Sequence, residues 1–481
     1  MPAPSQVADG NAEALYSQLA RQVVELIERG TLRSGERLPS VRELARERKV
    51  SVATVLAAYQ QLEREDHIEV RPKSGHFVRR RPVETPQMRR TRAPLQPARV
   101  SVSAGVSALL AALRDSAVVP LGAVSLAPEL YAVRDLNRTL SSIAREVTHA
   151  GATYEVPPGL LTLRRQLARR SLTWGVPLDE NDFCITVGAM EALHLALRAT
   201  TRPGQTVAVS SPMYFGVLQL IEELGLRVLE IPCDPEQGMD LDVLERALSH
   251  SSAIKACLAI PTFDNPLGAL MPQAARARLV WLLARHDVPL IEDDIYGDLA
   301  WDGSRPVPAK AHDRDGRVLL CGSTSKTLAA GYRVGWLVPG RYSERVQRLK
   351  FSHTVASPTL EQMAIAEYLA SGRYDRHLRT LRGRLAAQVK TFRDAISAAF
   401  PRGTRISDPK GSYVLWIELP RGTDSLKMQM AALSRGVAIA PGPIFSARQR
   451  YLNCIRINCG FPWSRRMEQA IALLGELAHG C

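Results

Sequence analysis

Two different rhythms of hydrophobic and polar residues divide the chain. In the first 80 residues, apolar side chains recur three and four positions apart, as in Leu15, Leu19, Val23 and Ile27, which is the spacing of one helix face. From about residue 118, short apolar runs alternate with helical stretches. The pattern therefore predicts a small, mainly helical domain followed by a larger one of alternating strands and helices.

The N-terminal part is predicted to form three short helices and a hairpin. Residues 40–43 (SVRE) form a capping box, in which the serine and the glutamate each bond a free amide at the start of a helix. A third helix starts near Ser51. One face of it presents Val52, Val55, Tyr59 and Leu62. The runs 68–71 and 76–79 alternate as strands do, on either side of a turn at 72–75.

Three helices and a hairpin predict a winged helix-turn-helix. The second helix of the turn, which starts near Ser51, would enter the major groove of DNA. The hairpin would reach the DNA backbone or the minor groove. Residues 1–80 hold 13 Lys/Arg and 11 Asp/Glu, so charge alone does not indicate DNA binding. A winged helix used for protein contacts would have the same pattern of elements.

The stretch GERLPSVRELARERKVSVATVLAAYQQLEREDHIEVRPKSGHFV is similar to the GntR-family DNA-binding domain over its whole length. This resemblance implies duplex operator DNA as a partner. The implied DNA face comprises Arg37, Ser40, Arg42, Ser51, Thr54, Tyr59, Lys73, Ser74 and Gly75. Val52 and Ala53 stand where the family usually has an arginine and a polar residue, which leaves the mode of base readout open. Asp66 replaces a usual glycine, which alters the following turn.

Residues 81–117 are expected to be a flexible linker, because they are rich in proline and arginine and poor in large apolar residues. Residues 71–99 carry nine Lys/Arg against one acid, Glu84. Such a run is either a solvated segment or a surface that contacts phosphates. A short amphipathic helix is expected within 103–114.

The larger part, residues 118–481, is predicted to be an α/β domain with a mainly parallel sheet wrapped by helices. The expected strands are 183–187, 206–210, 227–231, 254–260, 289–292 and 318–321. Ligands of such folds bind at the carboxyl ends of the strands. The residues that follow each strand are therefore the candidates for a site.

Several of these strand ends carry groups that suit a phosphorylated pyridine. Gly188, Ala189 and Met190 open a helix whose free amides can bind an anion. Tyr214 can stack on an aromatic ring, although a core tyrosine would look the same. Asn265 can donate a hydrogen bond to a phenolate oxygen.

Two acidic residues compete for the role of partner to a ring nitrogen. Asp293 and Asp294 end an apolar run, and Tyr296 follows. A carboxylate beside a pyridine nitrogen keeps it protonated, and that makes the ring an electron sink. The spacing of three between Asp293 and Tyr296 favours Asp293.

The stretch 322–333 (GSTSKTLAAGYR) combines groups for a phosphate and for an aldehyde. Ser323, Ser325 and Arg333 can hold the phosphate, and Lys326 can form a Schiff base. A surface loop of hydroxyls and cations is the alternative. Far downstream, Arg456 lies within a strand-like run, where a charge is costly unless it is paired. It suits either a substrate carboxylate or a structural ion pair.

In order and spacing, these groups resemble the site of class I aminotransferases of fold type I. The resemblance implies pyridoxal 5'-phosphate (PLP) on Lys326 and a small C-terminal α+β subdomain from about 395 to 481. It also implies that Tyr154 reaches the phosphate of a partner subunit. Ala330 stands where many relatives carry proline, which affects the loop to Arg333 but removes no functional group.

The two halves together resemble the MocR subfamily of GntR-family transcriptional regulators. That resemblance implies a head-to-tail homodimer that senses an amino compound, or PLP itself, through the aldimine on Lys326. An active aminotransferase with an accessory DNA-binding head is the alternative.

Composition bears on location. The seven cysteines are scattered without a C-x-x-C pair, which argues against disulfides and a metal site. Neither a signal peptide nor an apolar run of membrane length is evident. We expect a cytoplasmic protein that is associated with the nucleoid when bound to DNA.

Overall fold

The structure is a computed structural model that describes residues 15–29, 31–32, 35–71, 74–78, 86–147, 149 and 152–480. It divides into two compact units, Met1–Glu84 and Thr85–Cys481. They are called the head and the body below, and each is considered by itself. No helix in the described ranges combines the length and the hydropathy needed to cross a bilayer.

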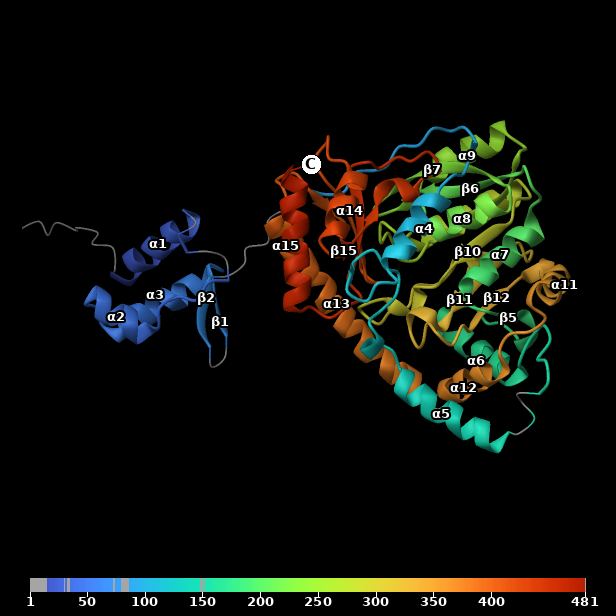
Figure 1. Ribbon diagram of the computed structural model, residues 1–481, viewed down its shortest axis with the longest axis horizontal. Coiled ribbons are helices and arrows are strands. Elements are labelled where there is room, and N and C mark those ends of the chain that lie inside the picture. The colour runs from blue at the N-terminus through green and yellow to red at the C-terminus, as the bar shows by residue number, and fades with distance from the viewer. Residues whose placement is uncertain are drawn as a thin grey trace, which may run out of the picture. The chain divides into compact units, whose positions relative to one another are not determined.

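The head contains the predicted helices and hairpin (Figure 1). Its elements are α1 (Leu15–Glu28), α2 (Val41–Arg48), α3 (Val52–Arg64), β1 (Ile68–Arg71) and β2 (Gly75–Val78). The strands pair antiparallel. Ser40 and Glu43 form the expected capping box, and Ser51 accepts a hydrogen bond from the amide of Thr54. Both helices of the turn therefore start where the sequence predicts.

Two predicted faces in the head differ from the observed ones. Tyr59 was expected on the apolar face of α3 from its spacing and on the DNA face from the family resemblance; its side chain is buried, and its hydroxyl donates to the carbonyl of Pro39, 2.9 Å away. Val52 was predicted on the same face as Val55 and Leu62, but it is 51% exposed. Tyr59 lies in the core because α3 packs against α1 and the hairpin through the face that includes residues 55, 59 and 62.

The body is built on a mixed, mostly parallel sheet. Its strand order is β3 (Ala98–Arg99), β7 (Arg227–Asp234), β6 (Thr206–Ser211), β9 (Ile254–Ala259), β10 (Leu290–Asp293), β11 (Val318–Ser323), β12 (Gly335–Val338) and β5 (Cys184–Thr186). β8 (Gly238–Met239) pairs with β7. All six predicted strands are present. The run from β7 to β11 is parallel, whereas β12 pairs antiparallel with both of its neighbours.

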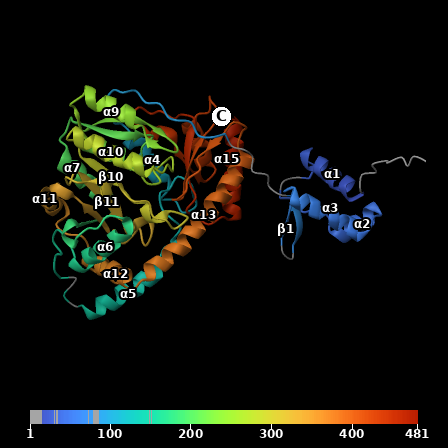
Figure 2. The same cartoon turned by 180° about the vertical axis from the view of Figure 1, so that it is seen from behind.

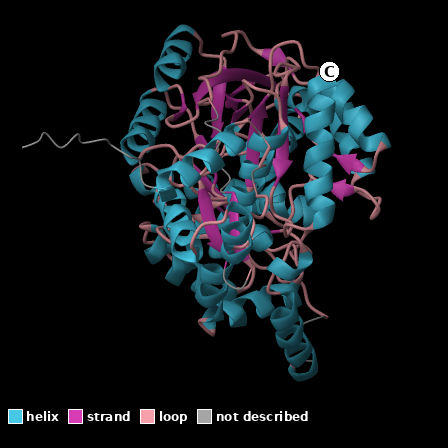
Figure 3. Ribbon diagram, turned by 90° about the vertical axis from the view of Figure 1, so that its left-hand side faces the viewer, coloured by secondary structure: helices cyan, strands magenta, loops and turns pink. Residues whose placement is uncertain are grey.

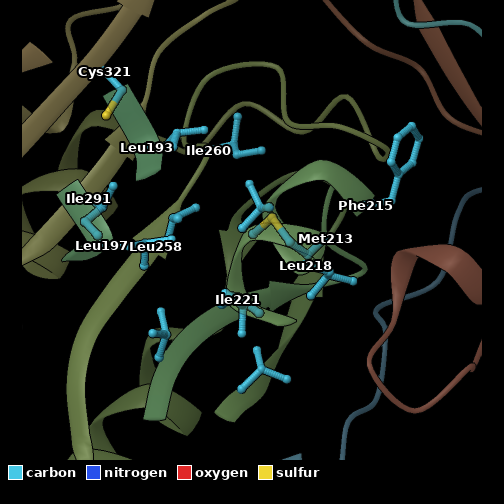
Figure 4. Close-up of a cluster of buried hydrophobic side chains, with 14 of the residues drawn as sticks. Leu193, Leu197, Met213, Phe215, Leu218, Ile221, Leu258, Ile260, Ile291 and Cys321 are labelled. Atoms are coloured by element: carbon cyan, nitrogen blue, oxygen red, sulfur yellow. The ribbon is translucent and has the colours of Figure 1, made fainter. Parts of the chain in front are cut away.

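Helices cover both faces of this sheet (Figures 1 and 2). One face packs against α4 (Ser103–Ala112), α7 (Ala189–Thr200) and α8 (Phe215–Glu223), and the other against α9 (Leu241–His250) and α10 (Gln273–Arg285). Figure 4 shows the first of these cores, where α7 and α8 meet strand residues such as Leu258 and Ile291. Figure 3 shows the strands lying inside a shell of helices.

The remaining helices of the large part of the body are α5 (Val133–Glu146), α6 (Leu161–Ser171), α11 (Ser343–Thr354) and α12 (Thr359–Ala370). The long α13 (Arg373–Ala399) leads into a smaller layer that holds α14 (Ser425–Ser434) and α15 (Arg465–Gly480). Its sheet has the order β13 (Arg405–Ile406), β14 (Val414–Glu418), β17 (Cys454–Asn458) and β16 (Ala440–Pro441). β15 (Val437–Ala438) pairs with β4 (Val119–Pro120), so residues near 119 join this layer.

The described part of the predicted linker, residues 86–117, belongs to the body. β3 pairs with β7, and α4 buries Val106 and Leu109 against α8 and the sheet. Earlier in this segment, Thr91 exchanges hydrogen bonds with the backbone of Cys233. A proline-rich segment can lie along a sheet edge in this way because an extended backbone still offers carbonyls and some amides for pairing.

Candidate functional site

One cavity of the body lies where β6, β9, β10 and β11 end. Nine of the residues predicted for the site line it: Ala189, Met190, Tyr214, Asn265, Asp293, Tyr296, Ser325, Lys326 and Arg333. Carboxyl ends of parallel strands share one edge, so predicted residues up to 144 positions apart meet there (189 and 333). Val124, Leu193, Ile260 and Ile295 complete the lining with apolar surface.

Lys326 ends the short 3₁₀ turn that follows β11. Its Nζ donates a hydrogen bond to the carbonyl of Val124. The pKa of Lys326 is lowered from 10.5 to about 8, mainly by burial and also by the charges of Arg456 and Arg333, while Asp293 opposes the shift. A lysine of this pKa is partly neutral near pH 8, so it can act as a nucleophile.

Asp293 and Asp294 have different environments. Burial raises the pKa of Asp293 to about 7, and its Oδ1 accepts a hydrogen bond from the amide of Ile295. Asp293 lines the cavity, whereas Asp294 forms an ion pair with Arg305. Arg305 also contacts Asp298, 2.9 Å away. Asp294 is thus part of a structural ion network, and Asp293 is the carboxylate available to a ligand.

Asn265 and Tyr296 face one another in the cavity. Asn265 Nδ2 lies 3.5 Å from the hydroxyl of Tyr296, and its buried Oδ1 has no partner. Burial raises the pKa of Tyr296, and it raises that of Tyr214 to about 12, so both phenols are neutral donors. An unpaired buried amide oxygen is uncommon, and it indicates a position where a ligand completes the hydrogen bonding.

Arg333 is held at the start of α7. Its guanidinium donates to Ser325 Oγ at 3.3 Å and to the carbonyl of Val187 at 3.1 Å. Gly188 has a φ of +77°, and a Cβ there would lie 2.4 Å from Arg333 Nη2, so only glycine fits. Ser323 Oγ lies 2.9 Å from Ser325 Oγ and accepts from the Ser325 amide. Hydroxyls, a guanidinium and helix amides thus converge as an anion site.

Arg456 is fully buried in β17 beside this cavity. Its Nη2 donates to the carbonyls of Gly122 and Ala123, but its Nε and Nη1 have no partner. The described residues supply no carboxylate for it, so the structural ion pair considered from the sequence is absent there. Two unsatisfied donors of a buried cation favour an anionic ligand.

Sequence reasoning missed a buried ion pair that supports the turn at 187–188. Glu191 Oε2 accepts from the amide of Val187 at 2.6 Å and from Lys350 Nζ at 2.8 Å. Glu191 Oε1 accepts from Thr354 at 2.7 Å. Lys350 and Thr354 lie on α11, 159 and 163 residues away, and no local pattern marks them as partners of Glu191.

Two further contacts near Lys326 come from α13. The hydroxyl of Tyr374 donates to Asp298 Oδ2 at 2.8 Å and lies 3.0 Å from Thr327 Oγ1. His377 Nε2 lies 2.6 Å from the carbonyl oxygen of Thr327. The helix that leads into the smaller layer is thereby bonded to the residue next to Lys326. A tyrosine or histidine on an amphipathic helix carries no sequence signal for such a contact.

The remaining predicted residues, Tyr154 and those of the head, do not line the cavity. Tyr154 is 79% exposed and does not line it. In the head, Arg37, Ser40, Arg42, Ser51 and Ser74 are exposed, and Thr54 and Gly75 are half-buried. Arg37 lies against Gly75, since a Cβ on that glycine would be 3.3 Å from Arg37 Nε. Lys73 lies outside the described residues.

Comparison with known proteins gives a match for each unit. Residues 130–472 match the family aminotransferase class I and II, and residues 15–78 match the bacterial regulatory proteins of the gntR family. YjiR of Escherichia coli, an HTH-type transcriptional regulator, is 38% identical over 96% of this chain and 98% of its own. YdcR of the same organism, also an HTH-type transcriptional regulator, is 37% identical over the same shares.

Solved structures of known proteins share the fold of the body. The kynurenine aminotransferase of Pyrococcus horikoshii has a TM-score of 0.73 and 28% identity, covering 81% of this chain and 95% of that one. LysN of Thermus thermophilus, an α-aminoadipate aminotransferase, has a TM-score of 0.72 and 27% identity, covering 78% of this chain and 94% of that one. Both agree with the fold-type-I architecture predicted for the body.

These matches imply pyridoxal phosphate as the cofactor, and the cavity fits it. The cavity provides an amine of lowered pKa, a buried carboxylate, the amide of Asn265 as a hydrogen-bond donor and a cluster of anion-binding groups. The chain belongs to the MocR subfamily of GntR-family transcriptional regulators, in which a winged helix-turn-helix is joined to a body of the aminotransferase class I and II family.

Proposed function

We propose that this protein is a PLP-dependent DNA-binding regulator that senses an amino compound at Lys326. The observation that carries the proposal is the convergence of Lys326, Asp293, Asn265 and Arg333 on one cavity of a chain that also has a GntR-type head. The head would bind an operator, and the body would bind the effector.

The phosphate of the cofactor would be bound at the carboxyl end of β11 and the start of α7. Ser325 and Arg333 supply a hydroxyl and a guanidinium, Ser323 positions Ser325, and the amides of Ala189 and Met190 point out of α7. Gly188 leaves space for Arg333. The ion pair of Glu191 and Lys350 stabilises the turn at residues 187–188, just before α7.

The ring of the cofactor would lie between Tyr214 and the ends of β9 and β10. Asp293 would pair with the ring nitrogen, and Asn265 and Tyr296 would donate to the ring oxygen. When bound, PLP supplies an aldehyde that condenses with primary amines and a ring that draws off electrons. A protonated ring nitrogen would keep Asp293 charged, since an adjacent opposite charge lowers the pKa of a carboxyl.

Lys326 would hold the cofactor and yield to an incoming amine. Its lowered pKa makes the neutral amine accessible near physiological pH. Arg456 would bind the carboxylate of an amino-acid effector through Nε and Nη1, the two donors that have no partner. An effector with both an amine and a carboxylate would therefore condense with the cofactor through its amine and satisfy the two unpaired donors of Arg456 through its carboxylate.

The contacts of Thr91 support a mechanical connection between the cavity and the segment of chain that leads to the head. Thr91 Oγ1 donates to the carbonyl of Ser211 at 2.6 Å, and Ser211 lies three residues before Tyr214. Ser211 Oγ also lies 2.8 Å from the hydroxyl of Tyr451, in the smaller layer of the body. A shift of that layer or of Tyr214 would act on the segment that leads to the head.

Tyr154 would complete the phosphate site of a partner subunit in a head-to-tail homodimer. Its 79% exposure and its absence from the cavity of its own chain support this role. Cross-linking of a Tyr154→Cys variant, or light scattering of the full chain, tests it. A strictly monomeric protein with full PLP affinity would contradict it.

The test of the main proposal is a gel shift with full-length protein on the DNA upstream of its own gene. Binding should respond to PLP together with a panel of amino acids and amines. A response to PLP alone, with no effect of any amine, would instead indicate a sensor of PLP. Sustained transamination at ordinary enzyme rates, with no effect on DNA, would favour an active aminotransferase, for which the cavity also holds the required groups.

A further inference from the structure

The exposed face of α3 is apolar. Residues 52–60 (VATVLAAYQ) contain no charged side chain. Val52 and Leu56, one helical turn apart, are 51% and 43% exposed. Ala53 is exposed and Ala57 half-buried on the same side. The face therefore presents a short stripe of methyl groups to solvent.

This stripe is not required for the core of the head. α3 packs through its opposite side, where Val55, Ala58, Tyr59 and Leu62 are buried. Single exposed apolar residues are common, but an aligned pair without any charge around it on the helix is less so. The neighbouring α2 behaves differently, because its exposed positions include Arg42, Glu43, Arg46 and Glu47.

Hydroxyls and charged residues flank the stripe along the chain. Ser51 and Thr54 stand at the start of α3, and Tyr59 ties this helix to Pro39, next to the start of α2. The preceding segment is basic on balance, since it exposes Arg37, Arg42, Arg46, Arg48 and Lys49 against Glu36, Glu43 and Glu47. An apolar strip with a basic margin is complementary to the major groove of DNA, where phosphates line the edges and thymine C5-methyl groups lie on the floor.

We propose that α3 reads thymine: Val52 and Leu56 pack against the C5-methyl groups of thymines in the major groove of the operator. This rests on the DNA binding proposed above and adds the base that is recognised. Residues 52–60 offer no arginine for guanine, so the half-site should carry T·A pairs under the start of α3. The departure from the family pattern at Val52 and Ala53 then has a chemical meaning.

The test uses full-length protein with PLP and a duplex selected by this protein from a random library. Each thymine of the duplex is replaced singly by deoxyuridine, which removes only the methyl group. At one or two positions in each half-site, the Kd should rise about fourfold per methyl lost, the value expected for one buried methyl group. The protein itself is unchanged in this experiment, so its folding is not at issue.

Two variants of the protein test whether Val52 and Leu56 are the side chains that recognise the methyl groups. Val52→Ser and Leu56→Ala should each lose the preference for thymine over deoxyuridine at one position. Leu15→Ser, at a 59% exposed position of α1, is the matched control and should keep it. Uniform tolerance of deoxyuridine, or a Val52→Ser protein that still distinguishes the two bases as the unmodified protein does, would overturn the proposal. Failure to select any duplex would overturn DNA binding itself and this proposal with it.

Discussion

The cavity of the body and the exposed face of α3 are opposite kinds of surface. The cavity buries charged groups, and burial raises the pKa of Asp293 to about 7 and lowers that of Lys326 to about 8. The face of α3 exposes apolar side chains. Each arrangement costs free energy in the isolated protein, since buried charges lose hydration and exposed methyl groups order water. Both costs are recovered when a partner of matching chemistry binds.

The comparison suggests how to find a binding surface without a ligand. In the body, the signal is a polar atom without a partner, such as Arg456 Nη1 or Asn265 Oδ1. In the head, the signal is an apolar stripe with a basic margin.

Lys326→Ala should abolish covalent attachment of the cofactor entirely, because no other amine lines the cavity among the described residues. Borohydride reduction followed by mass spectrometry measures the attached cofactor. Lys427→Ala, at an exposed lysine of α14, is the control and should keep it. Reduced adduct at full yield in the Lys326→Ala protein would remove this residue from the site.

Asp293→Asn and Asp294→Asn should have different consequences. The first should weaken PLP binding by roughly a hundredfold or more, since breaking a buried charge pair costs about 3–5 kcal/mol. The second leaves Arg305 without one partner, and should lower Tm with a smaller effect on the Kd for PLP. Fluorescence titration and thermal unfolding separate the two, and equal losses of affinity would contradict the different roles given to these neighbours.

The rate of cofactor attachment should depend on pH through Lys326. Its pKa of about 8 means that the reactive neutral form is lost as pH falls. The rate should therefore rise nearly tenfold between about pH 6 and pH 7, and level off above roughly pH 9. Stopped-flow absorbance measures it, and a rate that is flat across this range would show that the ionisation of Lys326 is not limiting.

Arg42→Ala should weaken operator binding by a few-fold to about tenfold. The slope of the logarithm of the binding constant against the logarithm of salt concentration should become shallower by about one, the value for one lost phosphate contact. Arg42 lies on the exposed side of α2, in the head, so the affinity for PLP should not change. Titrations at several salt concentrations give the slope. An unchanged slope would remove Arg42 from the DNA face.

Much of the fold follows from local patterns in the chain. The capping box at Ser40, the alternation of the hairpin strands and the apolar runs of the parallel strands all depend on residues a few positions apart. The stretch around Lys326 shows its chemistry for the same reason. Because ligands bind where parallel strands end, the order of the strands was sufficient to bring nine predicted residues to one cavity.

Tertiary structure decided which partner each side chain has. Spacing along α3 groups Val52 with Val55, Tyr59 and Leu62, but only the last three pack against α1 and the hairpin, and Val52 is exposed. The pairing of Glu191 with Lys350 and the docking of Thr91 on Ser211 join segments more than 100 residues apart. Periodicity describes one element at a time, whereas burial and ion pairing depend on what another element brings to it.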